Sequence, residues 1–179
     1  MDLPSFRYHP DPLASGSVVP SSDPCVVCGE ERGFLYEGPL YCEDDRDGSV
    51  CPWCIADGSA HRELDATFVD SEAFTDDVPA AVVEAITERT PGFASWGSDQ
   101  WPACCNDAAA FIQSAGIKEI RAIDPTLESA ALDHIVRQMG VSGTAATRLL
   151  NALDRERGPT AHVFRCLRCR AYRFEIDAV

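Results

Sequence analysis

Cys51-Pro52-Trp53-Cys54 is the stretch that decides the fold, because it is one of three Cys-x-x-Cys pairs in a chain of 179 residues. Such a pair lets two thiolates reach one metal ion from a tight turn, and Zn²⁺ prefers about four such ligands in a tetrahedron. With a vicinal pair, the set comprises Cys25, Cys28, Cys51, Cys54, Cys104, Cys105, Cys166 and Cys169. The sequence therefore predicts two structural four-cysteine zinc sites, which leave Cys42 over.

These cysteines divide between two sites in either of two ways. In the preferred partition, the pair at residues 25 and 28 is a knuckle, an aromatic hairpin follows, and the pair at 51 and 54 sits where a helix begins. That is the order of a treble-clef zinc finger, and the second site then holds residues 104, 105, 166 and 169. In the alternative partition, the first and last pairs form a ribbon of two knuckles, and residues 51 and 54 share an ion with 104 and 105.

Other side chains are candidates for the surroundings of these sites. Arg165, Arg168 and Arg170 bracket the last Cys-x-x-Cys pair, and we expect them to donate hydrogen bonds to its sulfurs. His61 lies seven residues after Cys54 and is an alternative ligand.

Cysteines also serve as core residues, disulfides or redox pairs, and Cys51/Cys54 superficially resembles a redox motif. The chain has nine cysteines, an odd number, and its first residues lack the basic and apolar segments of a secretory signal. We therefore expect a reducing, cytoplasmic location, where metal binding explains the pattern better than disulfides do.

Charge narrows the classes of partner. The chain carries 15 basic and 29 acidic residues, for a formal net charge of −14. A strongly acidic surface repels phosphate backbones and anionic lipids, and no apolar run approaches the roughly 20 residues of a membrane span. We expect no nucleic acid and no membrane insertion, and a basic protein as the partner, although the charge also serves plain solubility.

The chain outside the cysteines predicts an α+β fold with a central group of helices and short β-hairpins at both ends. Five prolines make residues 1–24 an extended arm, packed through Phe6, Tyr8 and Leu13. Aromatic residues on both sides of Gly38-Pro39 predict a hairpin. Alternation from Tyr172 onward predicts a strand after the last cysteine pair.

Four helices are expected after the one that begins at Cys51-Pro52 and stops at Gly58. They begin at Asp76 or Asp77, after Cys104-Cys105, at Asp124-Pro125 and at Ser142, and end near residues 90, 116, 140 and 158. We expect a single zinc-binding domain over 1–179, with an arm (1–24), a finger-like part (25–60), a helical part (76–158) and a C-terminal zinc hairpin (160–179).

Several strings together resemble the CbrC family, a poorly characterised bacterial family linked by name to colicin tolerance. They are Leu3–Pro12, Cys51–Ala60, Glu88–Phe93 with Trp96 and Trp101, and Phe164–Cys169. The resemblance covers residues 3–105 and 160–174. It implies no established reaction, but it implies a bacterial zinc protein and, through the name, a role in tolerance of a protein toxin. The family has His-Cys where this chain has Cys104-Cys105, which preserves the ligand chemistry.

The best catalytic candidate is His9, which Asp11 could orient as a general base. Asp57, Ser59 and Asp107 could join His9 around a second, hard metal ion, but the spacing of these carboxylates matches no motif for one. The alternative is that the His and Asp of a proline-rich arm tie down backbone. Nucleotide, esterase and metalloprotease motifs are absent from the sequence. The preferred hypothesis is a zinc-stabilised protein-interaction module, and the alternatives are a metal-dependent hydrolase that uses the His9/Asp11 arm or a thiol redox protein.

Overall fold

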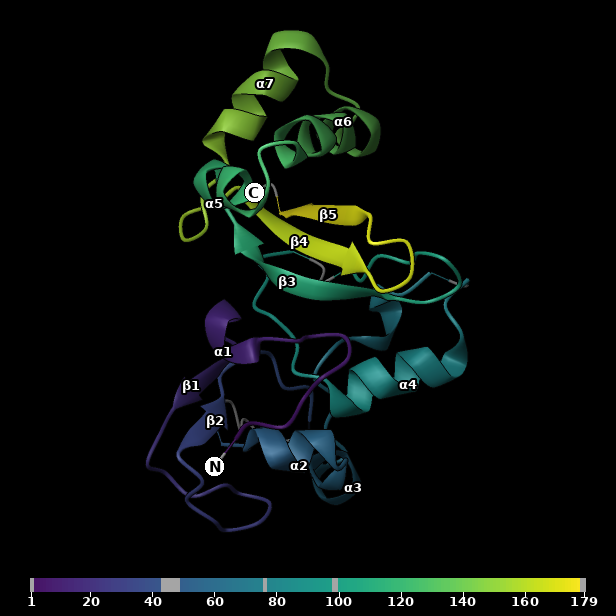
Figure 1. The fold of residues 1–179 in the computed structure, drawn as a ribbon. Coiled ribbons are helices and arrows are strands. Elements are labelled where there is room, and N and C mark those ends of the chain that lie inside the picture. Colours follow the sequence, from purple (N-terminus) through teal and green to yellow (C-terminus); the bar gives the residue numbers. More distant parts are fainter. Residues whose placement is uncertain (1, 43–48, 76, 98–99, 178–179) are drawn as a thin grey trace.

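The computed structural model describes residues 2–42, 49–75, 77–97 and 100–177 (Figure 1). Short helices combine with two antiparallel sheets, as the sequence predicts. The elements are α1 (Pro12–Ser15), β1 (Val18–Pro20), β2 (Phe34–Tyr36), α2 (Pro52–Ala56), α3 (Ser59–Leu64), the 3₁₀ turn η1 (Ser71–Ala73), α4 (Ala80–Arg89), β3 (Ala109–Ala115), α5 (Ile117–Ile123), α6 (Leu127–Met139), α7 (Gly143–Ala152), β4 (Thr160–Cys166) and β5 (Tyr172–Asp177).

The three-stranded sheet has the order β3-β4-β5, with β4 in the centre. One face packs against α5, α6 and α7, which lie above the sheet in Figure 1. The opposite face carries aromatic side chains: Phe93 stacks on Phe111 with ring centroids 4.2 Å apart, and Trp101 packs edge-on against Phe164. Because both faces are covered, successive residues of β4 are buried regardless of which way they point.

The other half of the molecule is built around the two-stranded sheet β1-β2 and helices α2 and α3 (Figure 1). β2 lies antiparallel to β1, with Val18 opposite Tyr36. The N-terminal arm then crosses to the larger sheet, where the backbone N–H of Phe111 donates to the carbonyl of Tyr8 at 2.8 Å. The first residues of the chain therefore connect the two halves.

Several expected elements are confirmed. Cys51 is the N-cap of α2 with Pro52 in its first turn, and Gly58 has the left-handed φ of 76° that ends it. α6 spans the predicted apolar repeat and stops at Gly140. α7 starts after Ser142 as predicted, but it ends at Ala152 and not near Gly158. The C-terminal residues form the predicted β structure as strands β4 and β5.

The helix predicted after Cys104-Cys105 is wrong, because residues 109–115 form strand β3. The alanine-rich run has high helix propensity, but its pairing with the central strand β4 prevails. The hairpin predicted about Gly38-Pro39 is also wrong: β2 pairs with β1, and Tyr41 bridges to Thr67. No second hairpin strand follows β2 among the described residues, so the treble-clef geometry is not confirmed.

Smaller corrections concern the arm and α4. The arm is extended apart from one helical turn, α1, and Leu13 is 42% exposed whereas Phe6 and Tyr8 are buried. Pro79, rather than Asp77, is the N-cap of α4. The alternative cap, Asp76, lies outside the described residues.

Candidate metal centres

Four sulfurs from the first half of the chain converge to form the first cysteine cluster (Cys25, Cys28, Cys51 and Cys54). Their sulfur atoms all lie within 4.8 Å of one another. The Sγ–Sγ distances are 3.8 Å for Cys25–Cys54, 3.9 Å for Cys28–Cys51 and 3.6 Å for Cys51–Cys54.

These distances are those of ligands around one shared ion. A Zn–S bond of about 2.3 Å gives a tetrahedron whose sulfurs are about 3.8 Å apart. A disulfide would need about 2.05 Å, and the eight cysteines of the two clusters are free thiols. The cluster is therefore arranged for tetrahedral coordination and not for oxidation to disulfides.

A tight backbone knuckle presents the first two sulfurs. The N–H of Gly29 donates to the carbonyl of Cys25 at 2.8 Å, and the N–H of Cys25 donates to the carbonyl of Glu30 at 3.1 Å. Gly29 has a φ of 71°, in the left-handed region where glycine carries no Cβ penalty. This turn directs Cys25 and Cys28 to the same side.

The start of α2 presents the other two sulfurs. The N–H of Cys54 donates to the carbonyl of Cys51, and the N–H of Cys51 donates to the Cys25 sulfur at 3.2 Å. The N–H of Val26 donates to the carbonyl of Ser49 at 2.9 Å and holds the knuckle beside the helix start.

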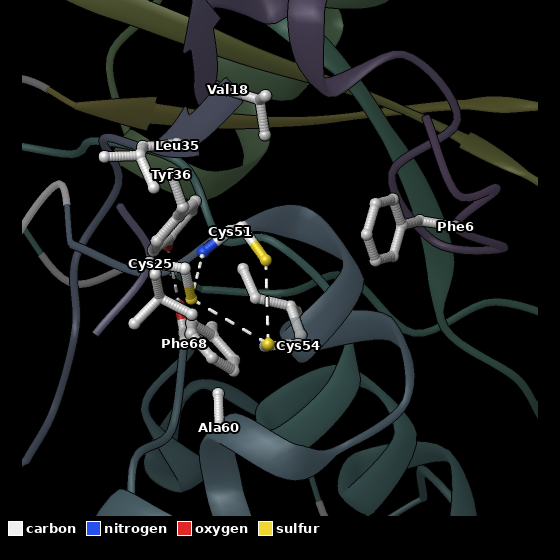
Figure 2. Close-up of a cluster of buried hydrophobic side chains, with 11 residues drawn as sticks. Phe6, Val18, Cys25, Leu35, Tyr36, Cys51, Cys54, Ala60 and Phe68 are labelled. Atoms are coloured by element: carbon white, nitrogen blue, oxygen red, sulfur yellow. Dashed lines mark hydrogen bonds between the residues drawn. The ribbon is translucent and has the colours of Figure 1, made fainter. Parts of the chain in front are cut away.

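The first cluster lies inside a hydrophobic core. Cys25, Cys51 and Cys54 are buried, whereas Cys28 reaches the surface. Figure 2 shows the three buried sulfurs surrounded by apolar side chains, which include Phe6, Val18, Leu35, Tyr36 and Phe68. A dication at this position would be shielded from water on most sides.

Without a cation, this environment keeps protons on part of the cluster. Burial raises the pKa of Cys54 to about 11, and the hydrogen bond to Cys25 raises the pKa of Cys51. The same hydrogen bond lowers the pKa of Cys25 to about 4. A dication favours the thiolate at every position, so binding would release protons.

The second cysteine cluster (Cys104, Cys105, Cys166 and Cys169) lies at one end of the three-stranded sheet. Its sulfurs also lie within 4.8 Å of one another, with 3.8 Å for Cys104–Cys105 and 3.6 Å for Cys104–Cys169. Strand pairing of Ala109 with Cys166 brings the two pairs together. The spacing again fits one tetrahedral ion, for which about 3.8 Å is expected.

A hairpin-like turn aims the vicinal pair. Ala103 bridges to Ala108, and the N–H of Cys104 donates to the carbonyl of Asp107 at 2.8 Å. Cys105 and Asn106 have φ values of 58° and 57°. Non-glycine residues pay a steric cost in this region, which the surrounding contacts must offset.

The last pair repeats the knuckle of the first cluster. The N–H of Arg170 donates to the carbonyl of Cys166 at 3.1 Å, and the N–H of Cys166 donates to the carbonyl of Ala171 at 2.8 Å. Arg170 occupies the left-handed position with a φ of 64°. The two knuckles thus share one hydrogen-bond pattern but place different residues at the strained position.

One arginine contacts a sulfur of the second cluster. Arg173 on β5 donates from Nη2 to the Cys104 sulfur at 3.2 Å. Two of the three expected donors have other interactions: Arg165 lies over the Tyr172 ring, and Arg168 lies 4.0 Å from Asp107. The sequence contained one indication of this contact. Side chains alternate along β5, and this alternation puts Arg173 and Glu175 on one face.

The second cluster is more exposed than the first, and its thiols differ from one another in exposure and in pKa. Cys105 and Cys169 are exposed, whereas Cys104 and Cys166 are buried. Burial raises the pKa of Cys104 to about 12. Burial also opposes ionisation of Cys166, but the N–H groups of Cys169 and Arg168 outweigh it and lower the pKa of Cys166 to about 6.

Asp107 anchors the second cluster to the N-terminal arm. It is only 2% exposed and accepts from Arg7 Nη2 at 2.7 Å and from the Tyr8 hydroxyl at 2.8 Å. Burial and this carboxylate raise the pKa of Tyr8 to about 12. The turn that carries Cys104 and Cys105 is thereby held against the arm.

The structure groups the cysteines as the preferred partition has them, and not as the ribbon of two knuckles requires. His61 lies outside both clusters. Its Nδ1 is 3.0 Å from the carbonyl of Ala66, and its Nε2 is 3.5 Å from Glu88.

The residues suggested for catalysis bind different partners. His9 is fully buried, with Nδ1 2.7 Å from the carbonyl of Pro91 and Nε2 2.7 Å from the Ser15 hydroxyl. Burial lowers the pKa of His9 to about 4. Asp11 instead caps α1 by accepting from the N–H of Ala14.

The two other suggested carboxylates, Asp57 and Asp107, also have hydrogen-bond partners of their own. Asp57 accepts from the N–H and hydroxyl of Ser59, and Asp107 binds the arm. The contacts of His9 and Asp11 therefore match the alternative prediction, in which the histidine and aspartate of the arm hold nearby backbone in place.

Comparison with known proteins gives a family but no activity. The profile of an uncharacterised protein family (UPF0167) matches residues 3–178. UPF0167 protein Mb2317 of Mycobacterium bovis is 43% identical over 168 residues, which cover 93% of this chain and 89% of that protein. UPF0167 protein PA1536 of Pseudomonas aeruginosa is 40% identical over 177 residues, or 98% and 97% of the two chains.

No solved structure matches this chain significantly. Across the described residues, every helix is too short or too polar to cross a bilayer. The comparisons support the uncharacterised family and do not bear on the CbrC name.

Proposed function

Because the chain belongs to the uncharacterised UPF0167 family, we propose, from its own chemistry, that it is a zinc protein with one structural Zn²⁺ in each cysteine cluster. The observation that carries the proposal is the sulfur spacing of 3.6–3.9 Å in both clusters. Four thiolates fill a tetrahedral shell and leave no position for water, which is the pattern of structural rather than catalytic zinc.

When bound, the ion would supply folding free energy by cross-linking segments that are separate in sequence. Cys25 and Cys28 would be tied to the start of α2, and the vicinal pair to the β4–β5 turn. Tetrahedral sulfur sites also accept iron, so the identity of the metal is part of the proposal.

Elemental analysis of protein purified under reducing conditions tests this directly. We expect two Zn per chain, and one in each of the double variants Cys51→Ser/Cys54→Ser and Cys104→Ser/Cys169→Ser. Cys42→Ser is the matched control, because this cysteine belongs to neither cluster, and it should retain both ions. Iron in place of zinc, or an unchanged count in the double variants, would contradict the assignment.

We further propose that the protein acts as an interaction module for a basic partner. The formal charge is −14, and each dication with four thiolates adds about −2 more. Complementary charge accelerates association and makes it sensitive to salt. Affinity for a lysine-rich partner should fall steeply between low and physiological salt, and an affinity independent of salt would argue against this role.

Tolerance of a colicin-type toxin, which the resemblance to the CbrC family implies, is the most specific form of this interaction. It predicts that bacteria lacking the gene are killed at lower colicin concentrations, and that a variant without the second cysteine cluster fails to restore tolerance. Equal killing of the two strains would remove this form of the proposal while leaving the zinc sites intact.

A thiol redox function is the second candidate, because seven of the cluster thiols lie within 4 Å of another. Alkylation distinguishes it from metal binding. Metal-bound cysteines resist the reagent until a chelator is added, whereas a redox pair reacts after reductant alone.

A further inference from the structure

Three side chains form a hydrogen-bonded chain across the larger sheet, away from both cysteine clusters. The Ser114 hydroxyl lies 3.0 Å from His162 Nδ1, and His162 Nε2 lies 3.1 Å from Asp177 Oδ2. Each residue comes from a different strand: β3, β4 and β5. Ser114 is directly opposite His162 in the strand register, so the two side chains share one face.

Asp177 is held as an ionised and oriented acceptor. Its carboxylate also accepts from the Ser95 hydroxyl at 2.7 Å, the N–H of Trp96 at 2.7 Å and the N–H of Gly97 at 3.2 Å. Burial opposes ionisation, but the hydrogen bonds from His162, Ser95 and Trp96 outweigh it and lower the pKa of Asp177 to about 2.

This carboxylate determines the tautomer of His162. An ionised Asp177 only accepts hydrogen bonds, so Nε2 carries the proton and Nδ1 offers its lone pair. The Ser114 hydroxyl then donates to Nδ1. His162 is 3% exposed and packs against Phe93 with centroids 4.7 Å apart, which fixes the plane of the ring.

The network opens onto a pocket of about 390 Å³ between the sheet, the arm and residues 93–96. Ser114 and His162 line it together with Phe93, Phe111 and Trp96. Trp96 is 76% exposed, although Phe93, which shortly precedes it in the sequence, is buried. A polar triad beside apolar walls is the composition expected of a small-molecule site.

The other buried histidine provides an internal contrast. His9 also contacts a serine, Ser15, but its other ring nitrogen is held by the carbonyl of Pro91 and not by a carboxylate. A carbonyl orients a ring but carries no charge to stabilise imidazolium. Of these two Ser–His pairs, one therefore has the third member that activation of a serine requires.

We propose that Ser114, His162 and Asp177 are the catalytic triad of a serine hydrolase that cleaves small, uncharged carboxylic esters in this pocket. The roles follow from the geometry: Ser114 is the nucleophile, His162 the general base and then acid, and Asp177 the group that orients and stabilises the imidazolium. The order of the ring nitrogens is the reverse of that in chymotrypsin-type enzymes, but the sequence of hydrogen bonds from serine to histidine to carboxylate is the same.

The reaction balances with the ester and water alone. Ser114 Oγ bonds to the ester carbonyl carbon while its proton passes to His162 Nδ1, and the carbonyl oxygen becomes an oxyanion. The oxyanion then collapses, the bond to the alkoxide breaks, and that alkoxide takes the proton from His162. Water next attacks the acyl carbon, gives its proton to His162, and releases the acid as Ser114 recovers the proton.

Charge and size define the substrate class. Glu37 and Glu156 line the pocket and the whole chain is acidic, which disfavours anionic substrates. Arg155 also lines the pocket and is the cationic group from which we expect donation to the oxyanion. The volume lies near the lower end of the 300–1,000 Å³ typical of ligand pockets, so a short acyl group is expected.

The test uses the full-length protein with its metal content measured. A fluorophosphonate probe should form a phosphorus–oxygen bond with Ser114 and release fluoride, and peptide mapping should place the adduct on Ser114 and not on Ser15. Hydrolysis of p-nitrophenyl acetate should fall by about 100-fold or more in Ser114→Ala and in His162→Gln. Ser129→Ala, on the exposed side of α6, is the matched serine control and should behave as wild type.

Asp177→Asn tests the third member. It keeps an acceptor for Trp96 but favours the wrong histidine tautomer, so kcat should fall far more than KM rises. Its folding is checked by the cooperativity of thermal unfolding. If the wild-type protein, folded and loaded with metal, gives neither an adduct on Ser114 nor hydrolysis above Ser114→Ala, the network is structural and the proposal is overturned.

Discussion

The two cysteine clusters share a knuckle but differ in how they are embedded. The first takes all its sulfurs from residues 25–54 and buries three of them in a hydrophobic core. The second joins residues that are 65 positions apart, Cys104 and Cys169, and leaves two sulfurs exposed. Similar local geometry therefore serves two purposes: the first cluster is the centre of its region, and the second fastens the end of a sheet that has its own core.

The largest difference should appear when one ligand is removed from each cluster. Cys51→Ser places a hydroxyl in a fully buried position and should lower the free energy of unfolding by about 4 kcal/mol or more, with loss of one ion. Cys105→Ser, at an exposed position, should cost less than half as much. Urea unfolding with metal counting measures both, and equal losses would show that burial does not distinguish the clusters.

The next effect concerns Arg173, which donates to a sulfur of the second cluster; within the described part of the chain the first cluster has no such arginine donor. Arg173→Met removes the hydrogen bond to Cys104 while keeping an apolar stem, and should weaken zinc binding there by about 10-fold. The first cluster should keep its affinity. Competition with a chromogenic chelator resolves the two ions, and Arg165→Met, which removes a cation that stacks on Tyr172, is the control.

The two knuckles have different residues at the left-handed position, Gly29 and Arg170, and a substitution at each position tests this difference. Gly29→Ala should destabilise the protein by about 1 kcal/mol, because a Cβ is strained at this φ although it meets no neighbour. Arg170→Gly relieves the same strain in the second knuckle and should be neutral or stabilising by up to about 1 kcal/mol. Thermal unfolding checks the signs, and a destabilising Arg170→Gly would mean that its side chain matters more than its backbone.

The smallest expected effect is a pH dependence of stability that arises in the larger sheet. Burial raises the pKa of Glu175 on β5 to about 7 from 4.5, and the residue faces His162 across the ladder with Arg173 beside it on the strand. The folded state holds this proton more tightly, so stability is lost as pH rises from about 4.5 to 7. Because Glu175 is partly exposed, the loss should be about 0.5 kcal/mol. Glu175→Gln should therefore stabilise the protein at pH 8 and have little effect at pH 5, and an equal effect at both pH values would contradict this assignment.

The sequence predicts the cysteine clusters and some of the helix ends, because these depend on local chemistry. Cys51 and Pro52 at the start of α2 and Gly140 at the end of α6 act through nearby backbone. The treble-clef order likewise led to the observed grouping of sulfurs, since each pair is close in sequence.

What depends on distant pairing could not be predicted. The residues of β3 have helical composition and become a strand only because β4, about fifty residues later, forms a ladder with them. The chain from Ser114 through His162 to Asp177 has no motif spacing, since strand register alone brings its members together. Arg173 was missed for the same reason: its partner, Cys104, is 69 positions away.

The order of the cysteines along the chain has a consequence for synthesis. All four sulfurs of the first cluster leave the ribosome before residue 60, so that cluster can take up its ion while the chain is still growing. Cys104 and Cys105 must wait for Cys166 and Cys169, which follow them by more than 60 residues. Because N-terminal parts generally fold first, the cell would load the two ions in sequence, and a ribosome stalled between them would hold a half-metallated chain.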